Sequence, residues 1–287
     1  MGALGTIITA IVTPFHEDGS VDEETFVSLM HHLAGHGSDG FVVCGTTGES
    51  ATLDTNEHMR VIELAVQEKP AGITIIGGTG SNDTRHAVEM TERATALGVD
   101  ATLSVTPYYN KPNRRGIRAH YETVAKATDK PILLYNIPGR TATNMPPDVL
   151  AELAQIDGIT GVKQANDDDL QPIDGLEVYA GNDGTLARTL DFGGAGGILV
   201  ASHIVGDEMR RMVDEPERRA EIDASLRDVF DTLFITASPT CTKAALHMLG
   251  LVPNETHRLP MVPADDAERE AVRSMLERHG LLETATR

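Results

Sequence analysis

Cysteine is nearly absent from this sequence, in which only Cys44 and Cys241 occur, far apart along the chain. Two cysteines cannot form the kind of disulfide framework that stabilises small secreted domains. Neither stands in a Cys-x-x-Cys pair with histidines at the spacing of zinc ligands. We therefore expect neither a disulfide framework nor a metal site.

Long apolar runs are also missing, whereas a transmembrane helix needs about 20 consecutive apolar residues. We therefore expect no membrane partner. The N-terminal segment MGALGTIITAIVTPF lacks the basic start and the small-residue cleavage site of a signal peptide. Together these observations predict a cytoplasmic protein.

Positive charge is scarce: 24 lysines and arginines stand against 43 acidic residues, and the formal net charge is −19. Such a chain repels nucleic acid, so nucleic acid is not an expected partner. One hypothesis is adaptation to a high-salt cytoplasm, where ionic screening relieves the self-repulsion of an acidic surface. This halophilic interpretation predicts that activity and melting temperature rise in molar salt, whereas an ordinary acidic enzyme would be indifferent.

Short apolar, β-rich runs alternate with longer amphipathic segments along most of the 287 residues. The apolar runs occupy residues 6–12, 40–45, 73–78, 101–105, 131–136, 159–164, 177–181 and 196–201. Strands that alternate with helices indicate a parallel sheet, and near-continuous apolar strands indicate a sheet buried on both faces. The pattern predicts an α/β fold, a (β/α)8 TIM barrel, although periodicity alone leaves an open doubly wound sheet as the alternative.

The strand pattern stops after about residue 205, and the segments that follow have only helical periodicity. We therefore expect a C-terminal helical extension. The predicted division is a catalytic barrel over residues 1–222 and a helical domain over residues 223–287.

Polar residues gather where the predicted strands end, which is the functional face of a parallel barrel. The segments concerned are GTTGES at 45–50, TPYYNKP at 106–112, YNIPGRT at 135–141 and AGNDG at 180–184. Each has an ordinary interpretation: a polar turn, a packed aromatic pair, a surface salt bridge. Only their joint occurrence on one rim favours a functional site.

Lys163 stands near the end of the buried run ITGVKQ. Its stem could pack inside while the ammonium reaches water, which is the common behaviour of lysine. The alternative is a desolvated amine with a lowered pKa that attacks a carbonyl carbon. A tyrosine on the neighbouring strand could shuttle protons, and backbone amides of the GTTG turn could hold a carboxylate. Together these residues suit Schiff-base chemistry on an α-keto acid.

The sequence strongly resembles the dihydrodipicolinate synthase and N-acetylneuraminate lyase superfamily of class I, pyruvate-dependent aldolases. The resemblance runs almost end to end, through TAIVTPF, GTTGESATL, VTPYYNKP, YNIPGRT, GVKQAN, GGAGGI and RLPMVP. It implies a (β/α)8 barrel with helices at the C-terminus, usually a homotetramer built from two tight dimers, and no cofactor. It also implies condensation of pyruvate with aspartate semialdehyde on the route to lysine.

The resemblance assigns roles to individual residues. Lys163 would form the Schiff base with pyruvate, Tyr135 would be the general acid and base, and Thr46 would link Tyr135 to Tyr109 of a neighbouring subunit. The remaining implied residues bind substrates: Thr47 holds the pyruvate carboxylate, Ile198 and Gly181 complete the pyruvate site, and Arg140 binds the carboxylate of the acceptor.

Two departures from the family pattern have consequences. Many bacterial members bind lysine as a feedback inhibitor, at a site that Ser50, Ala51, His58, Asn82 and Tyr108 match here. Thr55 and His86, however, replace a common histidine and a common glutamate, and the lost carboxylate predicts weak or absent lysine inhibition. Gln164 stands where many members have a carboxylate, so the groups that tune Lys163 are expected to differ.

Two other functions remain open on the sequence. A sister aldolase that acts on 2-keto-3-deoxygluconate or a related sugar acid would share the lysine chemistry, and Arg140 favours an acceptor with a carboxylate without deciding between two anionic substrates. A barrel that has lost catalysis and serves only in binding is the third possibility, and the intact set of Lys163, Tyr135, Thr46 and Tyr109 argues against it.

Overall fold

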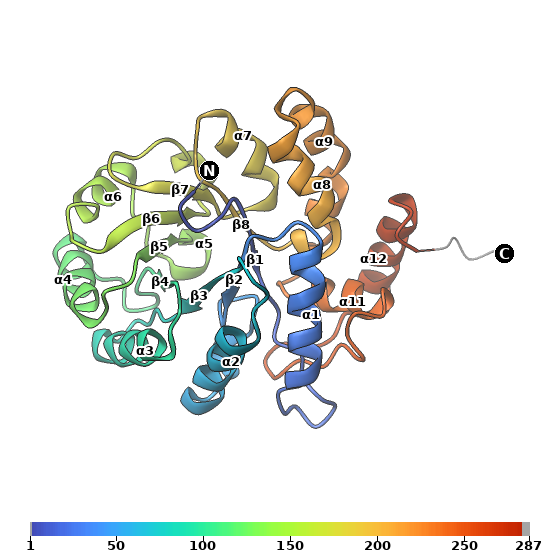
Figure 1. Ribbon diagram of the computed structural model, residues 1–287, viewed down its shortest axis with the longest axis horizontal. Helices are drawn as coiled ribbons and strands as arrows, with labels where there is room; N and C mark the ends of the chain where they lie inside the picture. Colours follow the sequence, from blue (N-terminus) through green and yellow to red (C-terminus); the bar gives the residue numbers. More distant parts are fainter. Residues whose placement is uncertain (1, 283–287) are drawn as a thin grey trace.

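The computed structural model describes residues 2–282. Eight parallel strands close into one barrel, in which each strand pairs with the next along the chain and the last pairs with the first (Figure 1). The strands are β1 (Ile7–Ala10), β2 (Gly40–Val43), β3 (Thr74–Gly78), β4 (Ala101–Val105), β5 (Ile132–Asn136), β6 (Ile159–Gln164), β7 (Glu177–Ala180) and β8 (Gly196–Leu199).

These strands confirm the eight apolar runs found in the sequence, and closure of the sheet shows that the open doubly wound alternative is wrong. Every residue of β1, β2, β5 and β8 is buried. A parallel strand in a barrel is covered by side chains of the interior on one face and by helices on the other, so alternation of polar and apolar residues disappears.

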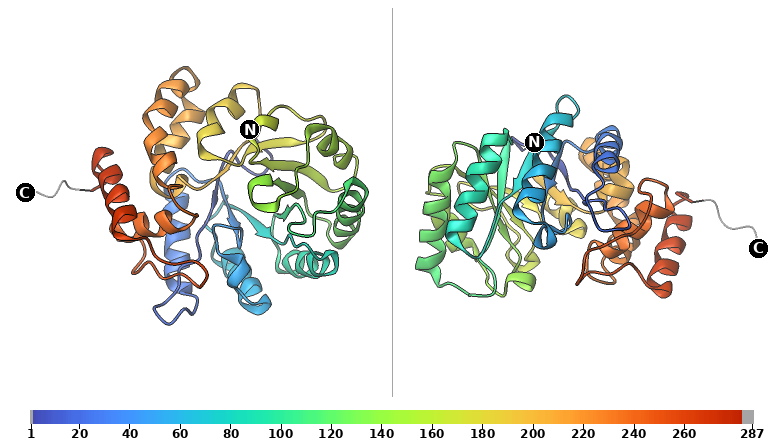
Figure 2. Two further views of the ribbon diagram at one scale, coloured as in Figure 1. Left: turned by 180° about the vertical axis from the view of Figure 1, so that it is seen from behind. Right: turned by 90° about the horizontal axis from the view of Figure 1, so that it is seen from below.

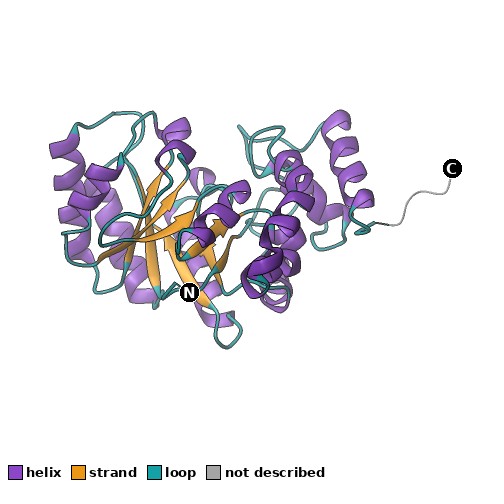
Figure 3. Cartoon of the chain, turned by 90° about the horizontal axis from the view of Figure 1, so that it is seen from above, coloured by secondary structure: helices purple, strands orange, loops and turns teal. Residues whose placement is uncertain are grey.

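Helices surround the strands on the outside of the barrel, as Figure 3 shows in purple around orange. Those of the barrel are α1 (Glu23–Gly35), α2 (Thr55–Glu68), α3 (Thr84–Leu97), α4 (Arg114–Val124), α5 (Pro138–Thr141), α6 (Pro147–Leu153), α7 (Leu186–Asp191) and α8 (Ser202–Asp214). Aspartates start three of them: Asp22, Asp54 and Asp83 accept hydrogen bonds from backbone N–H groups in the first turns of α1, α2 and α3. Such caps satisfy donors that have no partner within the helix.

The C-terminal segment contains α9 (Arg219–Ser225), α10 (Arg227–Thr232), α11 (Thr240–Met248) and α12 (Asp266–Arg278). It lies to one side of the barrel, next to α1 and α8 (Figure 2), and confirms the predicted helical extension. The predicted boundary between residues 222 and 223 falls inside α9, and the division into two domains stays a prediction. Within residues 2–282, no helix is both long and apolar enough to cross a membrane.

The barrel interior is a separate core from the layers between strands and helices. It contains Ile8, Val42, Ile76, Leu133 and Ile198, which come from five different strands. Branched side chains fill such an interior in layers, so the barrel is solid rather than a pore. The interior therefore offers a dry floor beneath the loops that follow the C-terminal ends of the strands.

Candidate functional site

Lys163 and Tyr135 lie side by side at the C-terminal ends of β6 and β5, because the register pairs these two residues directly. The register shifts between Ile132 and Leu133, where Gly161 allows close approach: a Cβ atom on Gly161 would stand 2.7 Å from a Leu133 methyl group. The Lys163 Nζ lies 4.5 Å from the centroid of the Tyr135 ring. The sequence prediction that the two side chains meet is thus supported by the geometry.

Lys163 is 5% exposed, so its ammonium does not reach bulk water as a surface lysine would. Burial lowers the pKa of Lys163 to about 8, because a charged amine is poorly solvated in the barrel interior. The negative charge of Asp183 raises this pKa and the positive charge of Arg140 lowers it, both to a smaller extent. At pH 7 about a tenth of the amine is then neutral and nucleophilic, compared with less than roughly one part in a thousand for a lysine of ordinary pKa.

Tyr135 is 6% exposed, and burial raises the pKa of its phenol to about 12. The Arg140 charge and the Thr46 side chain partly oppose this rise. The phenol thus keeps its proton in the resting site, and the Thr46 hydroxyl lies near enough to affect its pKa. The role of Thr46 as a link for protons stays a prediction.

The GTTG turn follows β2 and contains Thr46 and Thr47. Thr47 is only 5% exposed, whereas Thr46 faces solvent in the isolated chain. Thr13 fixes the turn from below, since its hydroxyl donates a hydrogen bond to the Gly48 carbonyl at 2.7 Å. Gly48 lies so near the β1 backbone that a Cβ atom would stand 3.2 Å from the Ile11 carbonyl oxygen.

Arg140 lies in α5, the short helix that starts at Pro138 directly after β5. Its side chain is exposed, but its charge affects the pKa values of both Tyr135 and Lys163. The guanidinium is therefore near the site and is free to bind an anion that arrives from solvent. Its position agrees with the expectation from the sequence.

Gly181 and Ile198 come from the ends of β7 and from β8. The Gly181 N–H donates to the Gln164 carbonyl at 2.7 Å, and a Cβ atom at this glycine would collide with Ala165. Ile198 is fully buried in the barrel interior. Both thus border the same end of the barrel as Lys163.

Tyr109 is the one predicted site residue that the single chain does not bring to Lys163. It is 87% exposed and has a left-handed backbone conformation with a φ of 71°. Hydrogen bonds from Asn110 to the Asn82 carbonyl and from Asn82 to the Tyr108 carbonyl fix its loop. Tyrosine is among the residues enriched at protein interfaces.

Asp183 was not singled out from the sequence, although it lies within the quoted segment AGNDG. It is 3% exposed, and its Oδ1 accepts hydrogen bonds from the N–H groups of Val200 and Ala201, both at 2.9 Å. Its Oδ2 has no hydrogen-bond partner among the described residues. The carboxylate thus fixes the turn after β8 and supplies a buried negative charge for Lys163.

Gln164 belongs to an amide network on the opposite face of β6 from Lys163. Its Oε1 accepts hydrogen bonds from the Asn136 side chain at 2.9 Å and from the Asn166 N–H at 3.0 Å. Asn136 also donates to the Asn144 side chain at 2.9 Å. Gln164 therefore holds the loops after β5 and β6 together, and the charges that act on Lys163 come from Asp183 and Arg140.

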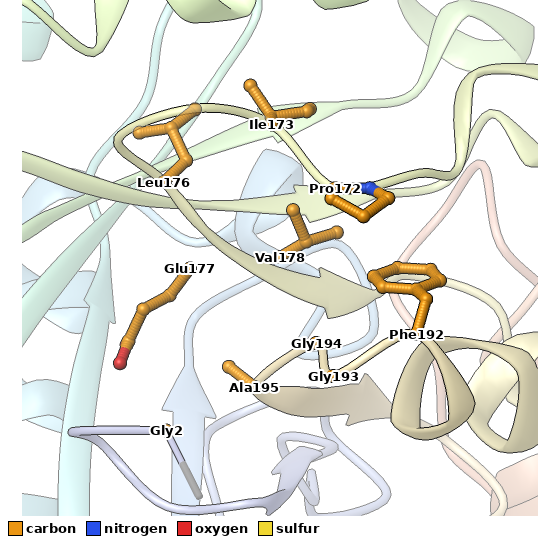
Figure 4. A pocket seen from close by; sticks show the side chains of 10 residues that line it. All are labelled: Gly2, Pro172, Ile173, Leu176, Glu177, Val178, Phe192, Gly193, Gly194 and Ala195. Carbon is orange, nitrogen blue, oxygen red and sulfur yellow. The ribbon is translucent and has the colours of Figure 1, made fainter.

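A cavity of about 230 Å³ lies at the other end of the barrel (Figure 4). It is bordered by Gly2, by Glu177 at the start of β7 and by Ala195 just before β8. It contains none of the residues described above, so it is separate from the candidate site. Among residues 2–282, no group of three or more His, Cys, Asp or Glu side chains is arranged to hold a metal ion.

Comparison with known proteins adds a family and close structural relatives. The model of the dihydrodipicolinate synthetase family matches residues 3–279. A 4-hydroxy-tetrahydrodipicolinate synthase from Syntrophobacter fumaroxidans is 42% identical over 287 residues, covering 96% of this chain and 98% of the relative. One from Halalkalibacterium halodurans is 41% identical over 279 residues, covering 93% of this chain and 94% of the relative.

Two solved structures have the same fold over nearly the whole length. The chloride-inhibited dihydrodipicolinate synthase from Acinetobacter baumannii, complexed with pyruvate, superposes with a TM-score of 0.93 at 36% identity, covering 98% of this chain and 100% of that one. The enzyme from Cyanidioschyzon merolae with lysine bound also gives a TM-score of 0.93, at 38% identity and the same coverage.

Proposed function

The chain belongs to the dihydrodipicolinate synthetase family, and from this premise we propose that it condenses pyruvate with L-aspartate 4-semialdehyde to 4-hydroxy-tetrahydrodipicolinate in lysine biosynthesis. It is then a lyase, a class I pyruvate-dependent aldolase of the cytoplasm. The observation that carries the proposal is the buried amine of Lys163 beside the Tyr135 ring at the C-terminal ends of paired strands.

Lys163 acts as the nucleophile. Its neutral amine adds to the ketone carbon of pyruvate, and the resulting carbinolamine loses water to form a Schiff base. Loss of a methyl proton gives an enamine, whose carbon forms the new bond to the aldehyde carbon of the acceptor. The acceptor's own amino group then attacks the imine carbon, which closes the ring and releases the Lys163 amine. The chemistry needs a proton at each step and requires no cofactor.

Tyr135 supplies and removes those protons, and Thr46 connects it to the outside of the site. In this proposal the relay is completed by Tyr109 of a second copy, which agrees with the 87% exposure of that ring in its own chain. The active form is thus an oligomer, a homotetramer built from two dimers. Tyr109→Phe should lower kcat although its ring touches no site residue of its own chain, and sedimentation should give the mass of a tetramer.

Thr47 and the backbone near Ile198 and Gly181 bind the pyruvate carboxylate. Thr47 is suited to this role because its hydroxyl lies in a buried turn whose glycines allow close approach to an anion. Thr47→Val should therefore raise the pyruvate KM more than it lowers kcat.

Arg140 binds the carboxylate of the second substrate. An exposed guanidinium next to the site can form a bidentate pair with an incoming carboxylate, which lysine could not match. The second candidate function, a 2-keto-3-deoxygluconate-type aldolase, would use the same Lys163 with a sugar aldehyde. Arg140 is the feature that favours the semialdehyde.

The test is direct. The protein is incubated with pyruvate and borohydride, and peptide mass spectrometry locates the reduced adduct, which we expect on Lys163. Aspartate semialdehyde and glyceraldehyde are then offered separately at fixed pyruvate. Preference for glyceraldehyde would refute the lysine-pathway assignment, and absence of any adduct would refute Schiff-base catalysis and favour a binding role.

We also propose that lysine inhibits this enzyme weakly or not at all. His58, one of the residues at the predicted lysine site, is 8% exposed, and its Nε2–H donates a hydrogen bond to the Gly78 carbonyl at 2.7 Å. Burial, together with the charges of His86 and Arg93, lowers its pKa to about 4. The positive charge of Arg93 disfavours an ammonium ligand nearby. Inhibition by micromolar lysine would contradict the proposal, and His86→Glu should increase sensitivity to lysine.

A further inference from the structure

Glu49 ends the GTTG turn in a conformation that is unusual for a residue with a side chain. Its φ of 53° and ψ of 36° are left-handed, a region that a non-glycine residue adopts only at an energetic cost. In this conformation its N–H donates to the Thr46 carbonyl at 3.1 Å. The backbone of Glu49 and the position of Thr46 are therefore linked, and the strained shape must be held from elsewhere.

The Glu49 side chain is held by the C-terminal extension. Its Oε1 lies 2.5 Å from the Nζ of Lys243, which is in α11, and both side chains are only 2% exposed. Its Oε2 accepts a hydrogen bond from the Arg258 N–H at 3.3 Å. Lys243 also donates to the Thr256 carbonyl at 2.9 Å. Both oxygens of a buried carboxylate are thus bound by residues 194 and 209 positions away in sequence.

The same cations contact the loops on either side of the turn. The Lys243 ammonium and the Arg258 guanidinium lie 4.3 and 4.7 Å from the centroid of the Phe15 ring. The guanidinium also donates to the Glu57 carboxylate at 2.6 and 2.7 Å and to the Thr52 carbonyl at 2.8 Å. The loop after β1, the GTTG turn and the start of α2 therefore share one anchor.

We propose that Glu49 and Lys243 are positioning residues for the pyruvate site: through this buried ion pair the C-terminal extension sets the conformation of the turn that carries Thr46 and Thr47. The inference rests on the proposed function for the roles of those two threonines. Neither Glu49 nor Lys243 touches substrate. The helical extension is then part of the machinery that shapes the site, although it contributes no catalytic group.

Lys243→Met tests the proposal. It removes the cation, keeps an unbranched side chain and leaves the Glu49 carboxylate buried without its partner. The turn should relax, and misplacement of a binding group by about 1 Å changes rates by up to roughly a hundredfold. We expect the pyruvate concentration for half-maximal borohydride trapping to rise roughly tenfold or more, with a smaller loss of trapping at saturation.

Arg269→Met is the matched control. It takes the cation away from another buried carboxylate of the C-terminal segment, Glu255, which lies 3.1 Å from Arg269 and is 3% exposed. It should lower the melting temperature as Lys243→Met does but leave the pyruvate concentration for half-maximal trapping unchanged within about twofold. Among residues 2–282, the Glu255 side chain forms an ion pair with Arg269 and no hydrogen bond or ion pair with the GTTG turn. Equal effects of the two variants on trapping would overturn the proposal, as would an unchanged value in Lys243→Met.

Glu49→Gln covers the case in which Lys243→Met does not fold. It keeps the size of the side chain and an acceptor for the Arg258 N–H. It should raise the pyruvate concentration for half-maximal trapping, as Lys243→Met does, but by a smaller factor. Normal trapping in this variant would also overturn the proposal. Failure of the wild-type protein to form any adduct would refute the proposed function instead, so the two outcomes are distinguishable.

Discussion

Two lysines are buried in this molecule, Lys163 at the end of β6 and Lys243 in α11, and their surroundings differ. Both are at most 5% exposed, and burial lowers the pKa of each. Lys243 contacts a carboxylate at 2.5 Å and a backbone carbonyl at 2.9 Å, which hold it as a cation. Among residues 2–282, no carboxylate lies within ion-pair distance of Lys163, and Asp183 acts on it only from further away.

The difference shows why one buried lysine can be a nucleophile and the other cannot. Removal of a proton from Lys243 would leave the Glu49 carboxylate buried without a counter-charge, which is strongly unfavourable. Removal of a proton from Lys163 breaks no ion pair and relieves the desolvation of the charge. Burial alone therefore does not identify a reactive lysine; burial without a bound carboxylate does.

The largest effect on activity should come from replacing Lys163 with methionine. Lys163→Met should abolish the borohydride adduct and lower kcat by roughly a thousandfold or more, because no other amine can form the Schiff base. Its melting temperature should change little, since an unpaired buried charge is replaced by an apolar chain. Steady-state kinetics and calorimetry measure the two effects.

Lys243→Met should show the reverse pattern: it should keep measurable trapping at high pyruvate but lose roughly 3–5 kcal/mol of unfolding free energy. Urea denaturation provides that value. If Lys163→Met destabilised the protein more than Lys243→Met, the distinction between the two lysines would be wrong.

Tyr135→Phe should have the next largest effect, a loss of roughly a hundredfold in kcat. The variant keeps the ring that lies 4.5 Å from the Lys163 Nζ and removes only the phenol proton. The pyruvate KM should therefore change much less than kcat. A proportional rise in KM would mean that the hydroxyl binds substrate rather than moving protons.

The pH dependence of trapping sharpens the comparison further. With a Lys163 pKa of about 8, the initial rate of adduct formation should rise with pH and level off above about 8, because only the neutral amine reacts. A rate that continued to rise toward pH 10 would indicate an unperturbed lysine.

Two substitutions should move the midpoint of this pH dependence, the pH at which adduct formation reaches half its maximal rate, in opposite directions. Asp183→Asn removes a negative charge that stabilises the protonated amine, so the midpoint should move to lower pH. Arg140→Ala removes a positive charge that disfavours it, so the midpoint should move to higher pH. Parallel shifts in the two variants would show that the charges do not act on Lys163 as described.

The smallest effect concerns salt. If the acidic surface reflects adaptation to high ionic strength, the melting temperature should rise by several degrees between 0.1 M and molar salt, because the Debye length falls from about 10 to 3 Å. The melting temperature of Lys243→Met should stay below that of wild type by the same amount in molar salt, since the Lys243–Glu49 pair is shielded from solvent ions. Thermal scans at both salt concentrations measure this.

Local patterns in the sequence were sufficient for the strands, and they predicted a site whose residues lie at one end of the barrel. The run ITGVKQ predicted β6 over the residues that form it, and the rim segments predicted Tyr135, Thr46 and Thr47 near Lys163. Asp183 and the Glu49–Lys243 pair were not recognised. A buried acid in a short turn, or a lysine in an amphipathic helix, has the same sequence pattern as a solvated one.

The sequence by itself determined the number of strands and their order along the chain, because short apolar runs between amphipathic segments must be buried wherever they lie. It also predicted which end of the barrel is functional, because polar residues follow most of the strands, whereas only the tertiary structure decided that the sheet closes. Only the tertiary structure decided that Tyr135 stands opposite Lys163, through a register shift beside Gly161. It alone decided which lysine has a carboxylate within reach, because ion pairing depends on distances between segments that are remote in the chain.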